Sequence, residues 1–301
     1  MPTSTDNLGG TINHMSKRIL DKSASYASYM KSEYLSIKHS SYFPVYDELF
    51  SNFRDKDITF VEIGVLNGGS LFMWRDFFGP KARIIGIDFN PAAKRWESEG
   101  FEIFIGSQSD PEFWSRFYES VGSVDIILDD GGHTNKQQIV TTTSSINHIN
   151  NGGILVVEDT HTSYMSDFGN PSKWSFIQYG KHLIDVISTR FSGLKSSKNS
   201  LTDSIHSVQF FESFVVFRID RERCYLSEPT SNGGVTYEAE DVRHKDTILG
   251  HVNQFRSYVG SKTPRLKKVT SLVYSARFIF AVLAKVKFFL ESRVIRKKYF
   301  K

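Results

Sequence analysis

The sequence predicts an α/β protein with a Rossmann-like core, and three observations point to it. Short apolar runs alternate with helical periodicity over residues 58–157, which is typical of a parallel sheet with helices on both faces. A glycine-rich turn at 64–69 follows the first apolar run. Acidic pairs end two later runs, at 129–130 and 158–159. Glycine turns and acidic strand ends of this kind mark the ligand-binding edge of such a sheet.

Seven strands and four intervening helices are expected. The parallel strands are Ile58–Ile63, Ile84–Ile87, Phe101–Ile105, Val124–Leu128 and Ile154–Val157. The helices between them lie near 70–78, 91–98, 111–120 and 135–149. Two further runs, Ser207–Phe211 and Phe214–Ile219, are separated by only two residues, so they predict an antiparallel hairpin. Five parallel strands and then a hairpin, with helices on both faces, are the order expected of a class I methyltransferase fold.

The chain divides into four predicted segments. Residues 1–53 are predicted to form an N-terminal helical cap, in which apolar side chains at helical spacing over 16–53 suggest two helices. Residues 54–222 contain the predicted strands and form the catalytic, cofactor-binding domain. A polar linker is expected over 223–262, followed by a basic amphipathic helix over 263–301.

Charge is distributed unevenly along the chain. Residues 261–301 hold twelve Lys and Arg and a single acid, Glu291, so this tail carries +11 and the remaining 260 residues carry −7. A basic tail on an acidic body favours anionic lipid as its partner, with nucleic acid less expected. The single cysteine, Cys224, excludes an intramolecular disulfide framework, and the first 30 residues lack the apolar run of a signal peptide. A cytoplasmic location is therefore expected.

The basic tail is expected to lie on a membrane surface. Its longest uninterrupted apolar run, Phe278–Ala284, is too short to span a bilayer. On a helical projection one face holds Leu272, Ile279, Val282, Leu283, Val286, Phe289 and Leu290. Residues 271–301 then fit a helix on an anionic surface, at the inner face of the plasma membrane. The alternative is a helix that docks on the body or on the partner subunit of a homo-oligomer.

A cofactor signature connects the first strand to the helix that follows it. Glu62, Gly64 and Gly68 form the pattern E-x-G-x-x-x-G, in which glycine allows a ligand close to the backbone and the helix N-terminus offers unpaired N–H groups. About 20 residues later Asp88 ends the second strand, where a carboxylate can bind both hydroxyls of a ribose. Because the tight diphosphate turn is missing, the pattern favours S-adenosylmethionine (SAM) over a dinucleotide, with Glu62 at the amino group of the cofactor. An ordinary turn that binds nothing is the alternative, which the placement of Asp88 disfavours.

Two acidic pairs and a histidine suggest metal-assisted chemistry. Asp129-Asp130 and Glu158-Asp159 end two parallel strands, so they share one edge of the sheet. Carboxylates gathered there repel one another unless a cation binds, and oxygen ligands suit Mg²⁺. A cation lowers the pKa of an acceptor hydroxyl, and His133 is the natural base to remove its proton. Helix capping or turn stabilisation explains Asp129 equally well.

Five motifs, in this order, resemble those of the macrolide and polyketide sugar O-methyltransferases. They are EIGV at 62–65 with GGSLFMWRD at 68–76, GID at 86–88, GSQSDPEF at 106–113, DDGGH at 129–133 and VEDTHTSY at 157–164. The mycinamicin and tetracenomycin rhamnosyl enzymes belong to this family, and the cephalosporin hydroxylases are a more distant relative. The similarity covers about residues 40–220.

The resemblance implies roles for individual residues. Asp130, Glu158 and Asp159 would bind Mg²⁺, and His133 would be the general base. Further cofactor contacts are implied at Ser70, Asp88, Gln108 and Ser109, the last two near the adenine.

The acceptor is less well defined by the sequence. Thr160, His161 and Tyr164 follow the second acidic pair and either line the acceptor pocket or are merely loop residues. The family pattern often has another polar residue at His161 and a tryptophan at Met165, so these departures leave the acceptor open. The prediction is SAM- and Mg²⁺-dependent methylation of a sugar hydroxyl on a glycan, glycolipid or glycosylated metabolite. A membrane-bound tail would favour polysaccharide or lipopolysaccharide biosynthesis; a catechol-type O-methyltransferase and a non-catalytic SAM-binding scaffold are the alternatives.

Overall fold

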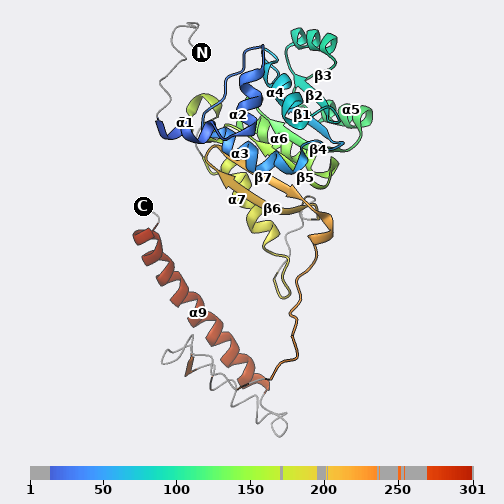
Figure 1. Cartoon of the computed structure of the whole chain (residues 1–301). Coiled ribbons are helices and arrows are strands. Elements are labelled where there is room, and N and C mark those ends of the chain that lie inside the picture. The colour runs from blue at the N-terminus through green and yellow to red at the C-terminus, as the bar shows by residue number, and fades with distance from the viewer. Residues whose placement is uncertain are drawn as a thin grey trace. The chain divides into compact units, whose positions relative to one another are not determined.

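A seven-stranded mixed sheet forms the centre of the computed structural model (Figure 1). The structure describes residues 14–169, 172–194, 201, 203–235, 237, 250–251, 254 and 270–299. The chain divides into two units, Met1–Pro229 and Thr230–Lys301. The sheet and the helices that cover it belong to the first unit, and helix α9 (Thr270–Tyr299) belongs to the second.

The strand order confirms the predicted fold class. The strands are β1 (Thr59–Ile63), β2 (Arg83–Asp88), β3 (Glu102–Ile105), β4 (Val124–Asp129), β5 (Ile149–Val157), β6 (Ile205–Phe211) and β7 (Phe214–Ile219). Their order is β3-β2-β1-β4-β5-β7-β6; β1 to β5 are parallel, and β7 is antiparallel to both β5 and β6. The order reverses between β1 and β4, and ligands bind beyond the carboxyl ends of the strands at such a point.

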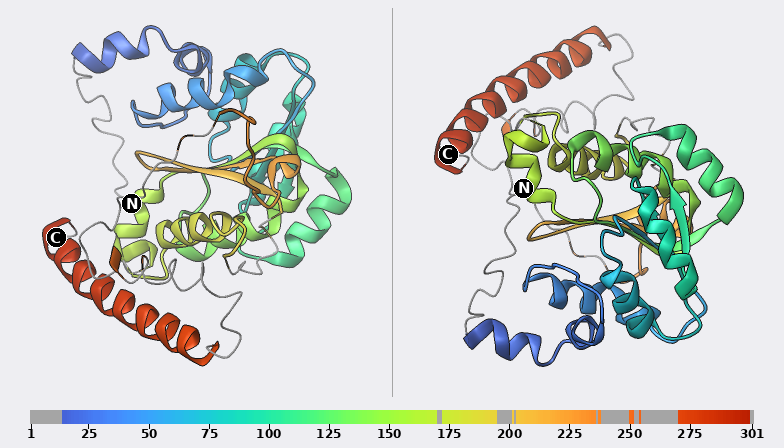
Figure 2. Two further views of the ribbon diagram at one scale, coloured as in Figure 1. Left: turned by 90° about the horizontal axis from the view of Figure 1, so that it is seen from below. Right: turned by 90° about the horizontal axis from the view of Figure 1, so that it is seen from above.

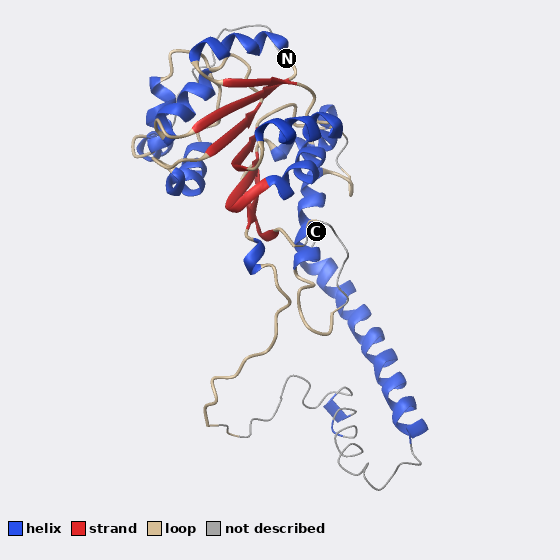
Figure 3. Cartoon of the chain, turned by 90° about the vertical axis from the view of Figure 1, so that its right-hand side faces the viewer, coloured by secondary structure: helices blue, strands red, loops and turns tan. Residues whose placement is uncertain are grey.

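Helices cover both faces of the sheet. The α-helices of the first unit are α1 (His14–Leu20), α2 (Ala24–Lys31), α3 (Tyr42–Phe50), α4 (Gly69–Phe78), α5 (Pro111–Val121), α6 (Asn135–Ser145) and α7 (Phe176–Ile187). Short 3₁₀ helices are η1 (Ser51–Phe53), η2 (Pro91–Glu99), η3 (Ile146–His148), η4 (Thr160–Tyr164), η5 (Ser166–Phe168) and η6 (Arg221–Arg223). Figure 2 shows α2, α3 and α4 on one face of the sheet and α5, α6 and α7 on the other, and Figure 3 shows that helices lie on both faces. This is the three-layer arrangement of α/β proteins.

Each face of the sheet packs against an aromatic layer. On the α4 face Trp74 is fully buried, with its ring centroid 5.2 Å from that of Phe60 and 5.4 Å from that of Phe50. On the other face Trp114 stacks on Tyr118 at 5.7 Å. Buried aromatic side chains contribute more apolar area than other residues, so these two layers fix both sets of helices on the sheet.

The structure differs from the predicted elements in four places. The predicted helix 91–98 is a 3₁₀ helix, η2. The predicted helix 135–149 is wrong at its end, because α6 stops at Ser145 and Ile149 already pairs with Val124 in the sheet. Between Val124 and Ile126 the register shifts, which accommodates the extra residues before Ile154. Sheet pairing has here overridden the local helical pattern. The N-terminal segment, where two helices were expected, contains three α-helices, and α7 was not predicted.

Only part of the predicted tail can be compared with the structure. Helix α9 accounts for Thr270–Tyr299, whereas 263–269, 300–301 and most of the predicted linker 223–262 lie outside the described residues. Among the described residues, no helix is both long and apolar enough to cross a membrane.

Candidate active site

Two glycines shape the loop between β1 and α4. Gly64 has φ +95°, and a Cβ added there would lie 2.1 Å from the backbone oxygen of Asp130. Gly68 has φ +79°, and its added Cβ would lie 2.3 Å from the indole ring of Trp96. Any residue with a Cβ is therefore disfavoured at Gly64 and Gly68, both by steric overlap and by the backbone conformation. The predicted cofactor loop consequently lies directly against the end of β4, where the first acidic pair is found.

Asp88 holds this loop from the end of β2. Its Oδ2 accepts hydrogen bonds from the backbone N–H groups of Val65, at 2.9 Å, and Leu66, at 3.2 Å. Its Oδ1 accepts one from the backbone N–H of Asn90 at 2.7 Å. An ionised carboxylate offers about four acceptor positions. Three are used by these N–H groups, so about one remains for a ribose hydroxyl, and the contact with both hydroxyls stays a prediction.

Glu62 and Ser70, both predicted as cofactor contacts, are hydrogen-bonded to each other. The Oγ of Ser70 donates to Glu62 Oε2 at 2.7 Å, and the indole N–H of Trp74 donates to Oε1 at 3.1 Å. Glu62 is fully buried, and this burial raises its pKa to about 7 although Lys38 pulls it down. The two residues thus fix the start of α4 beneath the loop, and their direct contact with a cofactor stays a prediction.

Gln108 braces the turn that follows β4. Its side-chain amide donates to Asp129 Oδ1 at 2.8 Å and to Thr141 Oγ1 at 3.1 Å, and its oxygen accepts from the backbone N–H of Gly132 at 2.9 Å. Asp129 is almost completely buried. Of the roles that the sequence left open for Asp129, the structure supports turn stabilisation. Ser109 is half-buried next to Gln108, and the adenine contacts of both stay predictions.

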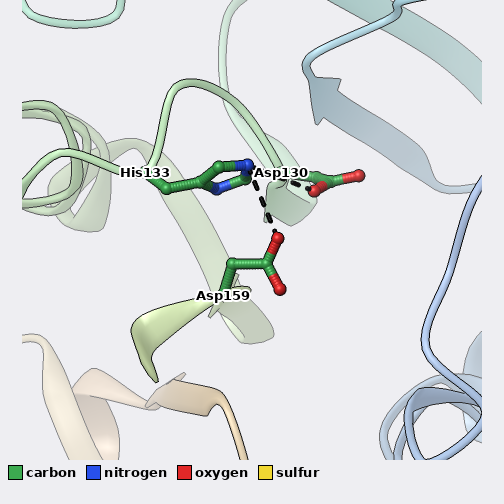
Figure 4. A group of neighbouring side chains, drawn as sticks. All are labelled: Asp130, His133 and Asp159. Carbon is green, nitrogen blue, oxygen red and sulfur yellow. Dashed lines mark ion pairs between the residues drawn. The ribbon is translucent and has the colours of Figure 1, made fainter. Parts of the chain in front are cut away.

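Asp130, His133 and Asp159 come together at the carboxyl edge of the sheet (Figure 4). Each offers one ligand atom, and these atoms lie within 4.8 Å of one another. His133 Nε2 is 3.5 Å from Asp159 Oδ2 and 4.0 Å from Asp130 Oδ1. Both His133, at φ +57°, and Asp159, at φ +53°, have left-handed backbones, which non-glycine residues adopt rarely and mostly at functional positions.

Glu158, the third predicted metal ligand, faces a different partner. It is fully buried, with Lys38 Nζ 2.9 Å from its Oε2 and the hydroxyl of Tyr46 donating to its Oε1. Burial raises the pKa of Glu158 to about 7, and the charge of Lys38 opposes this rise. The structure therefore brings Asp130 and Asp159 together with His133, whereas Glu158 lies behind them against the N-terminal segment.

Three residues of the N-terminal segment enter the site, and the sequence reasoning missed all of them. Lys38 Nζ is 2.5 Å from Asp130 Oδ2, Tyr46 bonds Glu158, and the hydroxyl of Tyr42 donates to Asp159 Oδ1. Burial and this hydrogen bond raise the pKa of Tyr42. Tyr42 and Tyr46 are one helical turn apart, so they share a face of α3, and that spacing was an available signal. Lys38 lies in a polar stretch without a motif.

A cavity of about 510 Å³ is lined in part by Tyr42 and His161, which both approach Asp159. Its lining includes His39, Tyr42, Thr160, His161, Tyr164 and Lys181. His161 Nδ1 lies 2.9 Å from Ser213 Oγ and 3.8 Å from Asp159 Oδ1. The three residues that the sequence offered as an acceptor lining therefore share one cavity next to the acidic group.

The sheet order and the edge site define the fold of class I methyltransferases, and comparisons with known proteins agree. No protein-family model matches the chain. The solved structure of MycE, a methyltransferase of the mycinamycin biosynthetic pathway, in complex with Mg, SAH and mycinamycin VI matches with a TM-score of 0.58 and 28% identity. That match covers 66% of this chain and 53% of MycE.

Curated relatives confirm the resemblance that the motifs indicated. Mycinamicin VI 2''-O-methyltransferase of Micromonospora griseorubida is 35% identical over 156 residues, which are 48% of this chain and 39% of that enzyme. A tetracenomycin-C relative, 8-demethyl-8-alpha-L-rhamnosyl tetracenomycin-C 2'-O-methyltransferase of Streptomyces olivaceus, is 32% identical over 148 residues, 44% of this chain and 39% of that enzyme. The chain thus spans about two fifths of the length of these relatives.

Proposed function

We propose that the chain is a SAM- and Mg²⁺-dependent O-methyltransferase that acts on a sugar hydroxyl. The observation that carries this proposal is the convergence of Asp130, His133 and Asp159 beside the glycine loop, next to a cavity. The likeness to MycE, whose structure contains Mg, SAH and mycinamycin VI, supports it, as do the sugar O-methyltransferases among the relatives.

The donor set fits a hard cation. Asp130 and Asp159 present carboxylate oxygens toward one point, and oxygen is the ligand that Mg²⁺ prefers. Glu158 is the adjacent third carboxylate. Together with Asp130 and Asp159 it makes up the three Mg²⁺ ligands that the family resemblance implies. When bound, Mg²⁺ would lower the pKa of an acceptor hydroxyl and orient it.

His133 is the residue that we assign as general base. Its Nε2 would take the proton of the hydroxyl while the O–C bond forms and the bond from sulfur to the methyl carbon breaks, which leaves S-adenosylhomocysteine. Asp159, 3.5 Å from Nε2, stabilises the resulting imidazolium. Tyr42 binds the other oxygen of Asp159, and Thr162 Oγ1 donates to the backbone oxygen of His133 at 2.9 Å. These two bonds hold the base and its partner in place.

The cavity supports a sugar as the acceptor. Aromatic side chains such as Tyr42 and Tyr164 can pack against the apolar face of a pyranose, whereas Lys181, Glu212 and the histidines offer partners for its hydroxyls. The combination of apolar surface with a few polar groups is usual for small-molecule sites.

A methyl-transfer assay tests this proposal. The purified chain is incubated with SAM and either rhamnosylated macrolides or free catechols, with Mg²⁺ or with EDTA, and products are identified by mass. We expect one added methyl group on a glycoside in the presence of Mg²⁺ and none with EDTA. Methyl transfer that is undiminished by EDTA would contradict the proposed requirement for Mg²⁺. Methyl transfer to catechols alone would instead support a catechol-type enzyme.

We further propose that helix α9 binds an anionic membrane surface, at the inner face of the plasma membrane. Val282, Val286, Phe289 and Leu290 are exposed on this helix, and the basic residues Arg293, Arg296, Lys297 and Lys298 follow them. Apolar and basic side chains together suit the boundary between anionic headgroups and acyl chains. Such a location would favour a lipid-linked or lipopolysaccharide sugar as the acceptor.

Vesicle sedimentation tests the tail. The full chain is expected to sediment with vesicles that contain phosphatidylserine but not with neutral phosphatidylcholine vesicles, and Phe289→Glu should abolish sedimentation because it places a charge on the apolar face. Arg116→Glu, a charge change at an exposed arginine of α5, is the control. Equal binding of wild type and Phe289→Glu would contradict the proposal.

A further inference from the structure

We propose that Lys38 is a tethered cation that competes with the divalent metal for Asp130 and Glu158. The inference rests on the proposed function, since it assumes that these carboxylates take part in metal binding. It goes beyond that function because it assigns to the N-terminal segment control over metal binding.

The geometry places one ammonium group between two carboxylates. Lys38 Nζ is 2.5 Å from Asp130 Oδ2 and 2.9 Å from Glu158 Oε2. The Lys38 side chain is 3% exposed and that of Glu158 is fully buried. Charges buried to this extent persist only when they are paired, so Lys38 supplies the positive charge that Asp130 and Glu158 require.

A divalent metal would need the same oxygens. Lys38 binds Oδ2 of Asp130, whereas Oδ1 of that carboxylate faces His133, so Asp130 is shared between the ammonium and the group formed with His133 and Asp159. An ammonium and a divalent cation at neighbouring positions repel each other strongly where little water is present. Full engagement of Asp130 and Glu158 by metal therefore requires Lys38 to withdraw.

The segment that carries Lys38 is suited to such a withdrawal. It connects α2 to α3 without regular structure, and Leu35, Ile37 and His39 on it are exposed. Its hydrogen-bonded anchors lie on both sides of Lys38. Ser32 Oγ donates to the backbone oxygen of Gly69 at 2.9 Å, and the backbone oxygen of His39 accepts from the N–H of Tyr42 at 3.0 Å. Because its neighbours Ile37 and His39 are exposed, the Lys38 side chain can leave the carboxylates without disturbing the packed core.

The test is metal affinity, measured with Mn²⁺ as a paramagnetic substitute for Mg²⁺. Free Mn²⁺ is followed by electron paramagnetic resonance during titration of wild type, Lys38→Met and Lys31→Met. Lys31 is a matched control because it also pairs with an aspartate, Asp76 at 2.9 Å, but is exposed. We expect Lys38→Met to bind Mn²⁺ at least tenfold more tightly than wild type and Lys31→Met to bind it equally well.

Two results would overturn the inference, and they differ in what they say of the proposed function. Equal or weaker Mn²⁺ binding by Lys38→Met, with normal binding by wild type, would show that Lys38 does not compete and would leave the proposed function intact. Absence of Mn²⁺ binding in wild type and both variants would overturn the metal requirement itself.

A second measurement uses the wild-type chain and does not depend on how the variant folds. Lysine acetylation by acetic anhydride is followed at each residue by mass spectrometry, with and without saturating Mn²⁺. Lys38 is expected to be protected without Mn²⁺ and to be acetylated at least fivefold faster with it, whereas Lys31 should be unchanged. Protection of Lys38 that persists at saturating Mn²⁺ would overturn the proposal.

Discussion

Replacing His133 with asparagine is expected to lower kcat for methyl transfer by about 10²–10⁴-fold, the range that general acid–base catalysis contributes. His133, which we propose as the general base, is grouped with Asp130 and Asp159. Its neighbour Asp159 has Oδ2 3.5 Å from Nε2. The affinity for SAM should change by less than about twofold because the glycine loop is untouched. Initial rates at saturating SAM and acceptor measure the effect.

A remote histidine provides the control for this loss. His148 stacks on Tyr118 with ring centroids 4.0 Å apart, just before β5 and therefore away from the carboxyl edge of the sheet. His148→Asn should keep the wild-type kcat. A His133→Asn variant with more than about a tenth of wild-type kcat would show that another group, or solvent, accepts the proton.

Replacing Gly64 with alanine is expected to lower the free energy of unfolding by roughly 2–4 kcal/mol and to abolish cofactor binding. The added methyl group would lie 2.1 Å from the backbone oxygen of Asp130, at a φ of +95°, so steric overlap adds to backbone strain. Relief requires the loop and the end of β4 to separate, which would move the glycine loop and Asp130 together. Chemical denaturation and SAM titration measure the two effects.

A Gly100→Ala variant distinguishes the effect of steric overlap from that of backbone strain. It has a similar φ, +85°, but nothing lies within 4 Å of a Cβ added there. Gly100→Ala should therefore cost only about 1 kcal/mol and leave SAM binding intact. If both variants lose equal stability and both bind SAM, the close approach of the loop to Asp130 is not what requires glycine at position 64.

The five parallel strands were predictable because each is a short apolar run that ends at a glycine or an acid. β1 and β4 are almost entirely buried. Apart from Glu62, Asp125 and Asp129, their residues are β-branched or apolar, as expected of buried parallel strands. The end of the predicted helix 135–149 was not predictable in the same way. Ile149 pairs with Val124 through the sheet register, which local sequence does not encode.

Within the site, the residues that follow strands were predictable. The contacts of the N-terminal residues were not, although the spacing of Tyr42 and Tyr46 indicates that they share one face of a helix. Asp130, His133 and Asp159 follow β4 and β5, so topology alone brings them to one edge. Lys38 reaches Glu158 across 120 positions of sequence, and no periodicity or motif marks such a contact. The side chain of Glu158 was placed on the correct edge, but its partners Lys38 and Tyr46 could only be seen once α3 was packed against the sheet.

Isothermal titration of the purified chain with SAM, with and without Mg²⁺, tests the central claim most directly. The same titrations are made on an Asp130→Ala/Glu158→Ala double variant. We predict that SAM binds in all four samples and that a separate Mg²⁺ binding event occurs in wild type and disappears in the variant. If the wild-type chain does not bind SAM, the proposed methyltransferase function is wrong, and the glycine loop of residues 64–69 has only a structural role.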